Sequence, residues 1–202
     1  TALARTFGRT LSITLLESEE IGTVGVGEAT IPTIHWFNEL IGLDETEFLR
    51  ATKASFKLGI EFVDWARPGH RYFHPFGSYG AALPGVAFHH RWLKACAEGL
   101  SMPLSALSLA GQLANDSRFA KPTGDARSIL STLGYAYHFD ANLFAAHLRT
   151  IAEPAGVTRI EGKLQDVERD PNSGFVRALT TQRGERLEGD LFIDCSGFRA
   201  LL

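Results

Sequence analysis

The apolar and polar positions of the chain divide it into predicted strands and helices. Apolar alternation, or a short apolar run between turn signals, indicates a strand, whereas apolar residues at helical spacing indicate a helix. The predicted strands cover residues 11–17, 55–65, 134–140, 157–161, 163–169 and 175–181, with a last buried strand starting at residue 189. The predicted helices cover residues 1–8, 32–41, 45–53, 89–98 and 141–155. Strands that alternate with helices indicate an α/β fold.

Local signals support several of these boundaries. Asp44 followed by Glu47 resembles a capping box at the start of the helix 45–53. Residues 170–174, Asp-Pro-Asn-Ser-Gly, predict a hairpin turn. Residues 1–17, a helix followed by a strand, fit the crossover helix and second strand of a βαβ unit in a dinucleotide-binding fold.

The strand 55–65 carries charged residues on one predicted face. Alternation places Lys57 and Glu61 on the same side, and an apolar, largely aromatic set on the other. If the charged side borders a cavity, Lys57 is a buried cation that needs partners. If that side meets solvent, the two residues form an ordinary charged edge of little energetic consequence. The pattern leaves both interpretations open.

The stretch 22–32 combines three glycines, an acid and a proline ahead of a predicted helix. Glycine reaches positive φ and has no Cβ, so such a backbone can lie against a flat or charged ligand. The preceding strand ends at Glu17, where an acid hydrogen-bonds a ribose hydroxyl in nucleotide-binding folds. An ordinary surface loop and a solvated acid fit the same residues, because glycine motifs are weak signals by themselves.

Aromatic residues and histidines are dense between residues 71 and 80. Such a run lines an aromatic-substrate pocket in some proteins, and in others it forms core. The candidates for substrate contact are Phe73, His74, Pro75 and Phe76. The pair His138 and Phe139 likewise fits either core or pocket.

Composition excludes several classes of protein. Apolar residues make up 45% of the 202 residues, charged residues make up 21%, and the net charge is −3, which indicates a globular chain without affinity for nucleic acid or an anionic membrane. No apolar run approaches the roughly 18 residues of a spanning helix, and no signal-peptide pattern is present. Cys96 and Cys195 form no CxxC motif, which indicates a reducing compartment, and we expect a cytoplasmic protein without a zinc site. Adjacent His89 and His90 cannot share one helix face, so no metal site is expected there either.

Three stretches together resemble one known family. GTVGVGEATIP (22–32), FKLGIEFVDW (56–65) and GDLFIDCSGFRALL (189–202) resemble the flavin-dependent tryptophan halogenases, in the order in which that family carries them. The residues of these stretches are most similar to those of bacterial halogenases that accept indole-like aromatics. The resemblance covers nearly the whole chain, and the GEATxP stretch followed by a lysine in FKxxIxF is far more specific than a glycine motif.

The resemblance implies a fold, a reaction and partners. The fold is an FAD-binding, Rossmann-like α/β domain similar to p-hydroxybenzoate hydroxylase, with an added β-sheet and helical substrate region. Residues 1–53 and 140–202 would form the flavin part, and residues 54–139 the substrate side. FADH2, supplied by a separate NAD(P)H-dependent flavin reductase, would react with O2 to give a flavin hydroperoxide. Chloride or bromide would convert it to hypohalous acid, which a lysine directs to an aromatic substrate.

The resemblance also assigns roles to residues of this sequence. Lys57 matches the catalytic lysine, and Glu17 matches the acid that binds ribose. Asp194 and Gly197 match a second FAD motif. The segment that straps the flavin matches Gly25, Val26, Gly27, Glu28, Ala29 and Thr30.

Other motifs of the family are missing from these 202 residues. The upstream GxGxxG and the downstream WxWxIP do not occur, so we expect a segment that is incomplete at both ends and poor at catalysis on its own. Two alternatives remain at this point. One is a flavin-dependent aromatic hydroxylase, and the other is a catalytically incomplete FAD-binding fragment.

Overall fold

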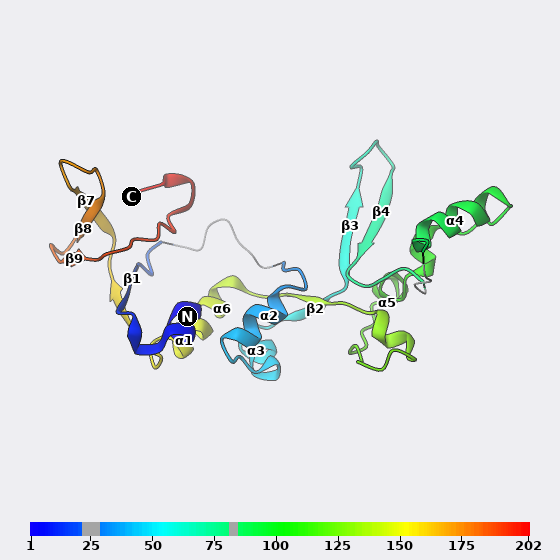
Figure 1. The fold of residues 1–202 in the computed structure, drawn as a ribbon, viewed down its shortest axis with the longest axis horizontal. Helices are drawn as coiled ribbons and strands as arrows, with labels where there is room; N and C mark the ends of the chain where they lie inside the picture. The colour runs from blue at the N-terminus through cyan, green and yellow to red at the C-terminus, as the bar shows by residue number, and fades with distance from the viewer. Residues whose placement is uncertain (22–28, 81–84) are drawn as a thin grey trace. The chain divides into compact units, whose positions relative to one another are not determined.

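The computed structural model describes residues 1–21, 29–80 and 85–202 (Figure 1). Contacts divide the chain into two compact units. The terminal unit comprises Thr1–Gly27 and Ala141–Leu202, and the central unit comprises Glu28–Asp140.

The terminal unit contains a parallel strand pair covered by helices. Strand β1 (Ile13–Glu17) pairs in parallel with β6 (Val157–Glu161), from Ile13 opposite Val157 to Glu17 opposite Glu161. Helices α1 (Ala2–Phe7) and α6 (Ala141–Ala152) contribute small buried residues to its core. That core consists of Ala4, Ala152 and Val157, with Ile13 and Ala155 against it. This pair does not test the predicted βαβ unit, because that prediction makes residues 11–17 the second strand after the helix 1–8, whereas β6 follows β1 in the chain.

An antiparallel sheet completes the regular structure of the terminal unit. It has the order β7 (Leu164–Arg169), β8 (Val176–Thr181) and β9 (Arg186–Glu188). The predicted hairpin turn is confirmed, since Asp170 Oδ1 accepts hydrogen bonds from the backbone N–H groups of turn residues 172 and 173 at 3.0 and 2.9 Å.

The last predicted strand does not form. Residues 191–196 have no regular structure, and the side chains of Leu191 and Ile193 are 80% and 62% exposed. The prediction of a buried strand here was wrong, because an apolar run becomes a strand only against a neighbour that pairs its backbone N–H and C=O groups. Among the described residues no strand pairs with it.

The central unit begins with two short helices, α2 (Ile34–Leu40) and α3 (Glu45–Ala51). The predicted cap of the second helix is confirmed, because Asp44 Oδ1 accepts a hydrogen bond from Glu47 N at 2.8 Å. Contacts group residues 28–53 with residues 54–139, whereas the sequence analysis drew its boundary at residue 53.

The predicted strand 55–65 is two strands with different partners. Strand β2 (Ser55–Lys57) pairs with β5 (Ala136–His138), and β3 (Gly59–Val63) pairs with β4 (Arg71–Pro75), both antiparallel. The chain changes partner at Leu58, which is buried against Ala110 and Leu133. The prediction of one continuous strand was therefore wrong. The alternating pattern continues through Leu58, but the chain leaves the first strand pair there and buries Leu58 in this core.

Close backbone packing explains the glycine after Leu58. A Cβ at Gly59 would lie 2.4 Å from the backbone oxygen of His74, so only glycine fits against β4 there.

Shorter elements fill the rest of the central unit. Helices α4 (Phe88–Ala97) and α5 (Leu109–Asn115) alternate with the 3₁₀ turns η2 (Leu104–Leu107) and η3 (Ile129–Thr132). No helix in the described parts of the chain combines the length and the apolar character needed to cross a membrane.

Candidate active site

Lys57 is a buried cation. The residue is only 8% exposed to solvent. This burial lowers the pKa of its amine from the ordinary value of 10.5. Its Nζ donates a hydrogen bond to the Thr30 backbone oxygen at 3.0 Å and lies 5.3 Å from the centre of the Phe76 ring. Of the two interpretations left open by the sequence, the buried cation is the one observed.

Glu61 does not partner this lysine. It lies on β3 and forms an exposed ion pair with Arg71 on β4, with Arg71 Nη2 2.7 Å from Glu61 Oε2. The predicted charged face is therefore separated into a buried cation and an unrelated surface pair.

Strand β5 lies between Lys57 and its hydrogen-bond partner. Lys57 stands opposite Ala136 in the β2–β5 register, and Thr30 pairs with Tyr137 along the other edge of β5. Thr30 N and Oγ1 both donate to Tyr137 O, at 3.0 and 2.9 Å, and Tyr137 N donates to Thr30 Oγ1 at 3.0 Å. Ala136 is fully buried, and its small side chain leaves room for the lysine to cross the strand.

A carboxylate and two phenols hold β5 in place. Tyr135 and Tyr137 both donate to Glu45 Oε1, at 2.5 and 2.7 Å, and Lys121 pairs with Glu45 Oε2 at 2.5 Å. Burial acts to raise the pKa of Glu45, but the hydrogen bonds from Lys121, Tyr135 and Tyr137 outweigh it and lower the pKa to about 2. Burial raises the pKa of Tyr137, so its hydroxyl stays protonated and donating. The strand beside Lys57 is thus held by a hydrogen-bonded polar network around Glu45.

Lys57 also borders a cavity of about 350 Å³ with aromatic walls. Phe56 stacks on Phe119 with ring centres 3.7 Å apart, and Phe73 forms another wall. The lining residues are Phe56, Lys57, Leu58, Gly59, Phe73, Ala114, Ser117, Arg118, Phe119 and His138. This open pocket has an aromatic lining and a volume that suit a small aromatic molecule.

The four candidate substrate residues have different environments in the structure. Phe73 lines the cavity, and Phe76 contacts the lysine amine. His74 is exposed, and Pro75 is buried where β4 ends against Gly59. Neither His74 nor Pro75 is among the residues that line this cavity.

Sequence reasoning missed several cavity residues and left another undecided. His138 stands opposite Ser55 and therefore shares the sheet face of Lys57. Burial, and then the charge of Lys57, lower the pKa of His138. Arg118 and Phe119 follow α5 in an irregular segment, and no motif in the sequence pointed to them.

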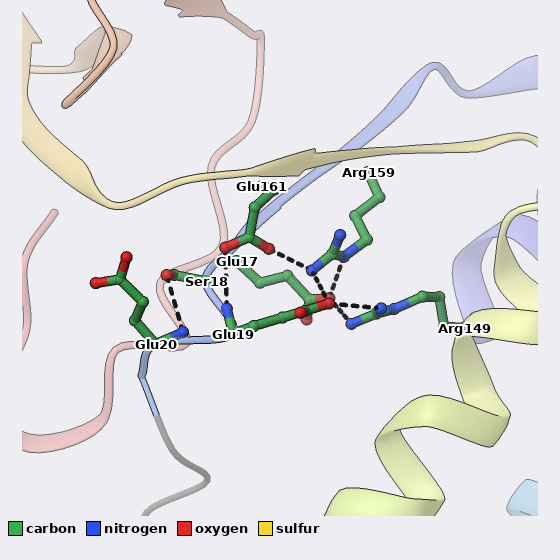
Figure 2. Close-up of polar contacts among 7 residues, drawn as sticks. All are labelled: Glu17, Ser18, Glu19, Glu20, Arg149, Arg159 and Glu161. Carbon is green, nitrogen blue, oxygen red and sulfur yellow. Dashed lines mark hydrogen bonds and ion pairs between the residues drawn. The ribbon is translucent and has the colours of Figure 1, made fainter.

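Glu17 is the candidate ribose acid in the terminal unit. It is the last residue of β1, and its Oε1 accepts hydrogen bonds from Arg149 at 2.8 Å and Arg159 at 2.5 Å (Figure 2). The carboxyl ends of parallel strands are the usual ligand edge of an open α/β sheet. Both donors reach Oε1, and no described residue donates to Glu17 Oε2.

The other candidate flavin residues have mixed outcomes. Asp194 is exposed and organises the end of the chain, where Oδ1 accepts from Ser196 N at 2.7 Å and Oδ2 from Leu202 N at 3.0 Å. Gly197 has φ +66° and begins the 3₁₀ turn η4 (Gly197–Arg199). Four candidates of the strap, Gly25, Val26, Gly27 and Glu28, lie outside the described residues, whereas Ala29 and Thr30 pair with β5.

Comparison with known proteins gives consistent matches over the full chain. A model of the tryptophan halogenase family matches residues 1–202. Tryptophan 6-halogenase SttH of Streptomyces toxytricini is 35% identical over 219 residues, which covers 99% of this chain and 41% of SttH.

Solved structures agree. BrvH, a flavin-dependent halogenase from Brevundimonas sp. BAL3, is 48% identical with a TM-score of 0.88. Xcc4156, a flavin-dependent halogenase from Xanthomonas campestris, is 46% identical with a TM-score of 0.89. All of this chain is covered in both cases, but it spans only 40% of each of those proteins. These matches confirm the predicted α/β flavin-binding fold class. Because the family model matches every residue from 1 to 202, and not the glycine stretch alone, the chain belongs to the tryptophan halogenase family.

Proposed function

We propose that the protein carrying this chain is a flavin-dependent halogenase that transfers chlorine or bromine to an indole-like aromatic substrate, with Lys57 as its catalytic lysine. One observation carries the proposal: Lys57 is a buried cation that borders an aromatic cavity and bonds Thr30, the last residue of the expected flavin strap. Such an amine is shielded from water, as a reactive halogen donor requires.

Lys57 would act as the acid of the reaction. FAD, when bound in its reduced form, supplies hypohalous acid from O2 and a halide. The Lys57 ammonium donates a hydrogen bond to the oxygen of that acid. As the ring carbon takes the halogen, the O–halogen bond breaks, and the oxygen takes a proton from Lys57 and leaves as water. The ring proton then passes to the neutral Lys57 amine, which restores the ammonium. A lowered pKa makes this ammonium a better proton donor than an exposed lysine.

The aromatic walls would hold the substrate. Phe73, Phe56 and Phe119 offer flat apolar surfaces beside the lysine, and Phe76 keeps the amine in place through its ring. Mounting Lys57 on a paired strand fixes the distance between donor and ring better than a loop would.

The candidate flavin residues keep the roles that the resemblance assigns to them in this proposal. Glu17 would accept from the adenosine ribose, Ala29 and Thr30 would belong to the strap with Gly25, Val26, Gly27 and Glu28, and Asp194 with Gly197 would form the second FAD motif. In this proposal residues 1–53 and 140–202 serve the flavin, and residues 54–139 serve the substrate. A separate NAD(P)H-dependent reductase would supply the reduced cofactor.

Product analysis of the intact protein tests the proposal. The protein would be incubated with flavin reductase, NADH, FAD, bromide and indole, and the products identified by mass spectrometry. We expect brominated indole. Substitution Lys57→Ala should reduce its formation at least 100-fold while flavin oxidation continues, because general-acid groups contribute about 10²–10⁴-fold.

Lys94→Ala is the matched control, since Lys94 is an exposed lysine of α4 paired with Glu98. It should leave product formation unchanged. Hydroxylated products alone would indicate an aromatic hydroxylase. Brominated product at a comparable rate in Lys57→Ala would show that Lys57 has another role, and tight FAD binding without any turnover would indicate a binding module.

A further inference from the structure

An ion-pair cluster surrounds Glu17 at the carboxyl ends of β1 and β6 (Figure 2). Its members come from three elements and the turn that follows β1. They are Glu17, Glu19, Arg149 on α6, Arg159 and Glu161.

Arg159 is the centre of this cluster. Its Nε donates to Glu17 Oε1 at 2.5 Å, and its Nη2 contacts Glu161 Oε2 at 2.5 Å and Glu19 Oε1 at 3.3 Å. Its side chain is 15% exposed, the lowest value in the cluster. Its contacts are therefore the least screened by water.

Arg149 approaches the same oxygen from α6. Its Nη2 lies 2.8 Å from Glu17 Oε1, and its Nη1 lies 3.2 Å from Glu19 Oε1. Both guanidinium groups thus converge on Oε1 of Glu17, and no described residue donates to Oε2. Two charge-assisted hydrogen bonds on one oxygen fix the rotation of the carboxylate and keep the other oxygen available.

We propose that Arg159, assisted by Arg149, is a positioning residue for the cofactor, which holds Glu17 so that Oε2 accepts hydrogen bonds from the vicinal hydroxyls of the adenosine ribose. The inference rests on the proposed function, which assigns Glu17 to that ribose. Holding the acceptor in advance removes the ordering cost that a mobile glutamate would add to binding.

A purely structural cluster makes a different prediction. If Arg159 only ties α6, β1 and β6 together, its loss would weaken binding of every flavin ligand alike. If it acts through Glu17, its loss should matter only to ligands that carry the adenosine hydroxyls.

Flavin titration of the intact protein separates the two roles. Oxidised FAD, an FAD analogue without the adenosine 2′-hydroxyl, and FMN would be titrated by fluorescence. We expect wild-type protein to bind the analogue about tenfold more weakly than FAD, which is the size of one charge-assisted hydrogen bond. Arg159→Gln should bind FAD about tenfold more weakly, bind the analogue no more weakly than FAD, and leave FMN affinity unchanged. This lack of additivity identifies coupling through Glu17.

Controls make each outcome decisive. Arg186→Gln removes an exposed arginine of the same unit, paired with Glu168, and should change none of the affinities. If Arg159→Gln does not fold, as judged by circular dichroism, Arg159→Lys and Arg149→Gln carry the same test. The inference would be overturned if Arg159→Gln and removal of the 2′-hydroxyl weakened binding additively. It would also be overturned if Arg159→Gln weakened FMN binding as much as FAD binding. Equal wild-type affinity for FAD and the analogue would instead remove Glu17 from the ribose and overturn that part of the proposed function.

Discussion

Lys57 and Glu17 are the two charged residues on which the proposed chemistry depends, and they differ in solvent exposure and in their charged partners. Lys57 is buried, and among the described residues its amine has only a carbonyl oxygen and an aromatic ring as partners. Glu17 is partly exposed and receives two guanidinium groups.

This difference fits the tasks proposed for the two residues. Burial without a countercharge lowers the pKa of Lys57, which makes the amine a stronger proton donor. Opposite charges hold Glu17 as an acceptor of fixed orientation. The lysine is thus prepared for transfer of a proton, and the glutamate for binding that does not change its charge.

The largest expected effect comes from closing the path of the lysine. Ala136→Leu puts a bulky side chain where Lys57 crosses β5, at a fully buried position. We expect the free energy of unfolding to fall by about 1–3 kcal/mol through overpacking, and halogenation per folded molecule to fall by at least tenfold. Urea unfolding and product formation measure the two effects.

Ala178→Leu provides the matched control for this change. Ala178 is equally buried but lies on β8 in the terminal unit. It should destabilise the protein to a similar degree without affecting halogenation per folded molecule. Equal loss of activity in both variants would contradict the idea that Lys57 must reach across Ala136.

The second comparison concerns stability and distinguishes two carboxylates. Glu45→Gln should lower the free energy of unfolding by about 3 kcal/mol at neutral pH, since its pKa of about 2 lies well below the ordinary value of 4.5 and one pKa unit corresponds to about 1.4 kcal/mol. A depressed pKa stabilises the fold above pH 4.5, and this contribution disappears as the pH falls towards 2. Urea unfolding between pH 2 and 7 should therefore show a flatter acid limb for Glu45→Gln than for wild type.

Glu17→Gln is the comparison for that measurement. Its carboxylate is more exposed, and exposed ion pairs contribute about 0–1 kcal/mol. Equal destabilisation by the two substitutions would show that the Tyr135–Tyr137–Glu45 network does not anchor β5 more firmly than the arginine cluster holds β1.

The smallest effect concerns the protonation of Lys57. Because its pKa is lowered in the folded state, the unfolded chain binds more protons just below pH 10.5, and Lys57 makes the fold more stable as the pH rises through that window. Lys57→Met should remove this slope. NMR of reductively ¹³C-methylated protein should show the Lys57 resonance titrating below the range of a free lysine side chain, and a Lys57 resonance that titrates in that range would contradict its burial.

Sequence patterns anticipated the local structure well. The cap at Asp44 and the hairpin turn at residues 170–174 depend on contacts within a few residues, and both are confirmed. The strand 157–161 is confirmed as well, although its partner β1 is distant in the sequence. The motif around Lys57 likewise identified the family, which the comparison with known proteins confirmed.

Only the tertiary structure decided the surroundings of the functional residues. Burial of Lys57 depends on Ala136, which lies 79 residues further along the chain. The orientation of Glu17 depends on Arg159, which lies 142 residues further along. The same holds for the partner change at Leu58, for the exposed run that begins near Leu191, and for the cavity position of Arg118. Periodicity tells which residues share a face, but what covers that face depends on which distant strands and helices pack against it.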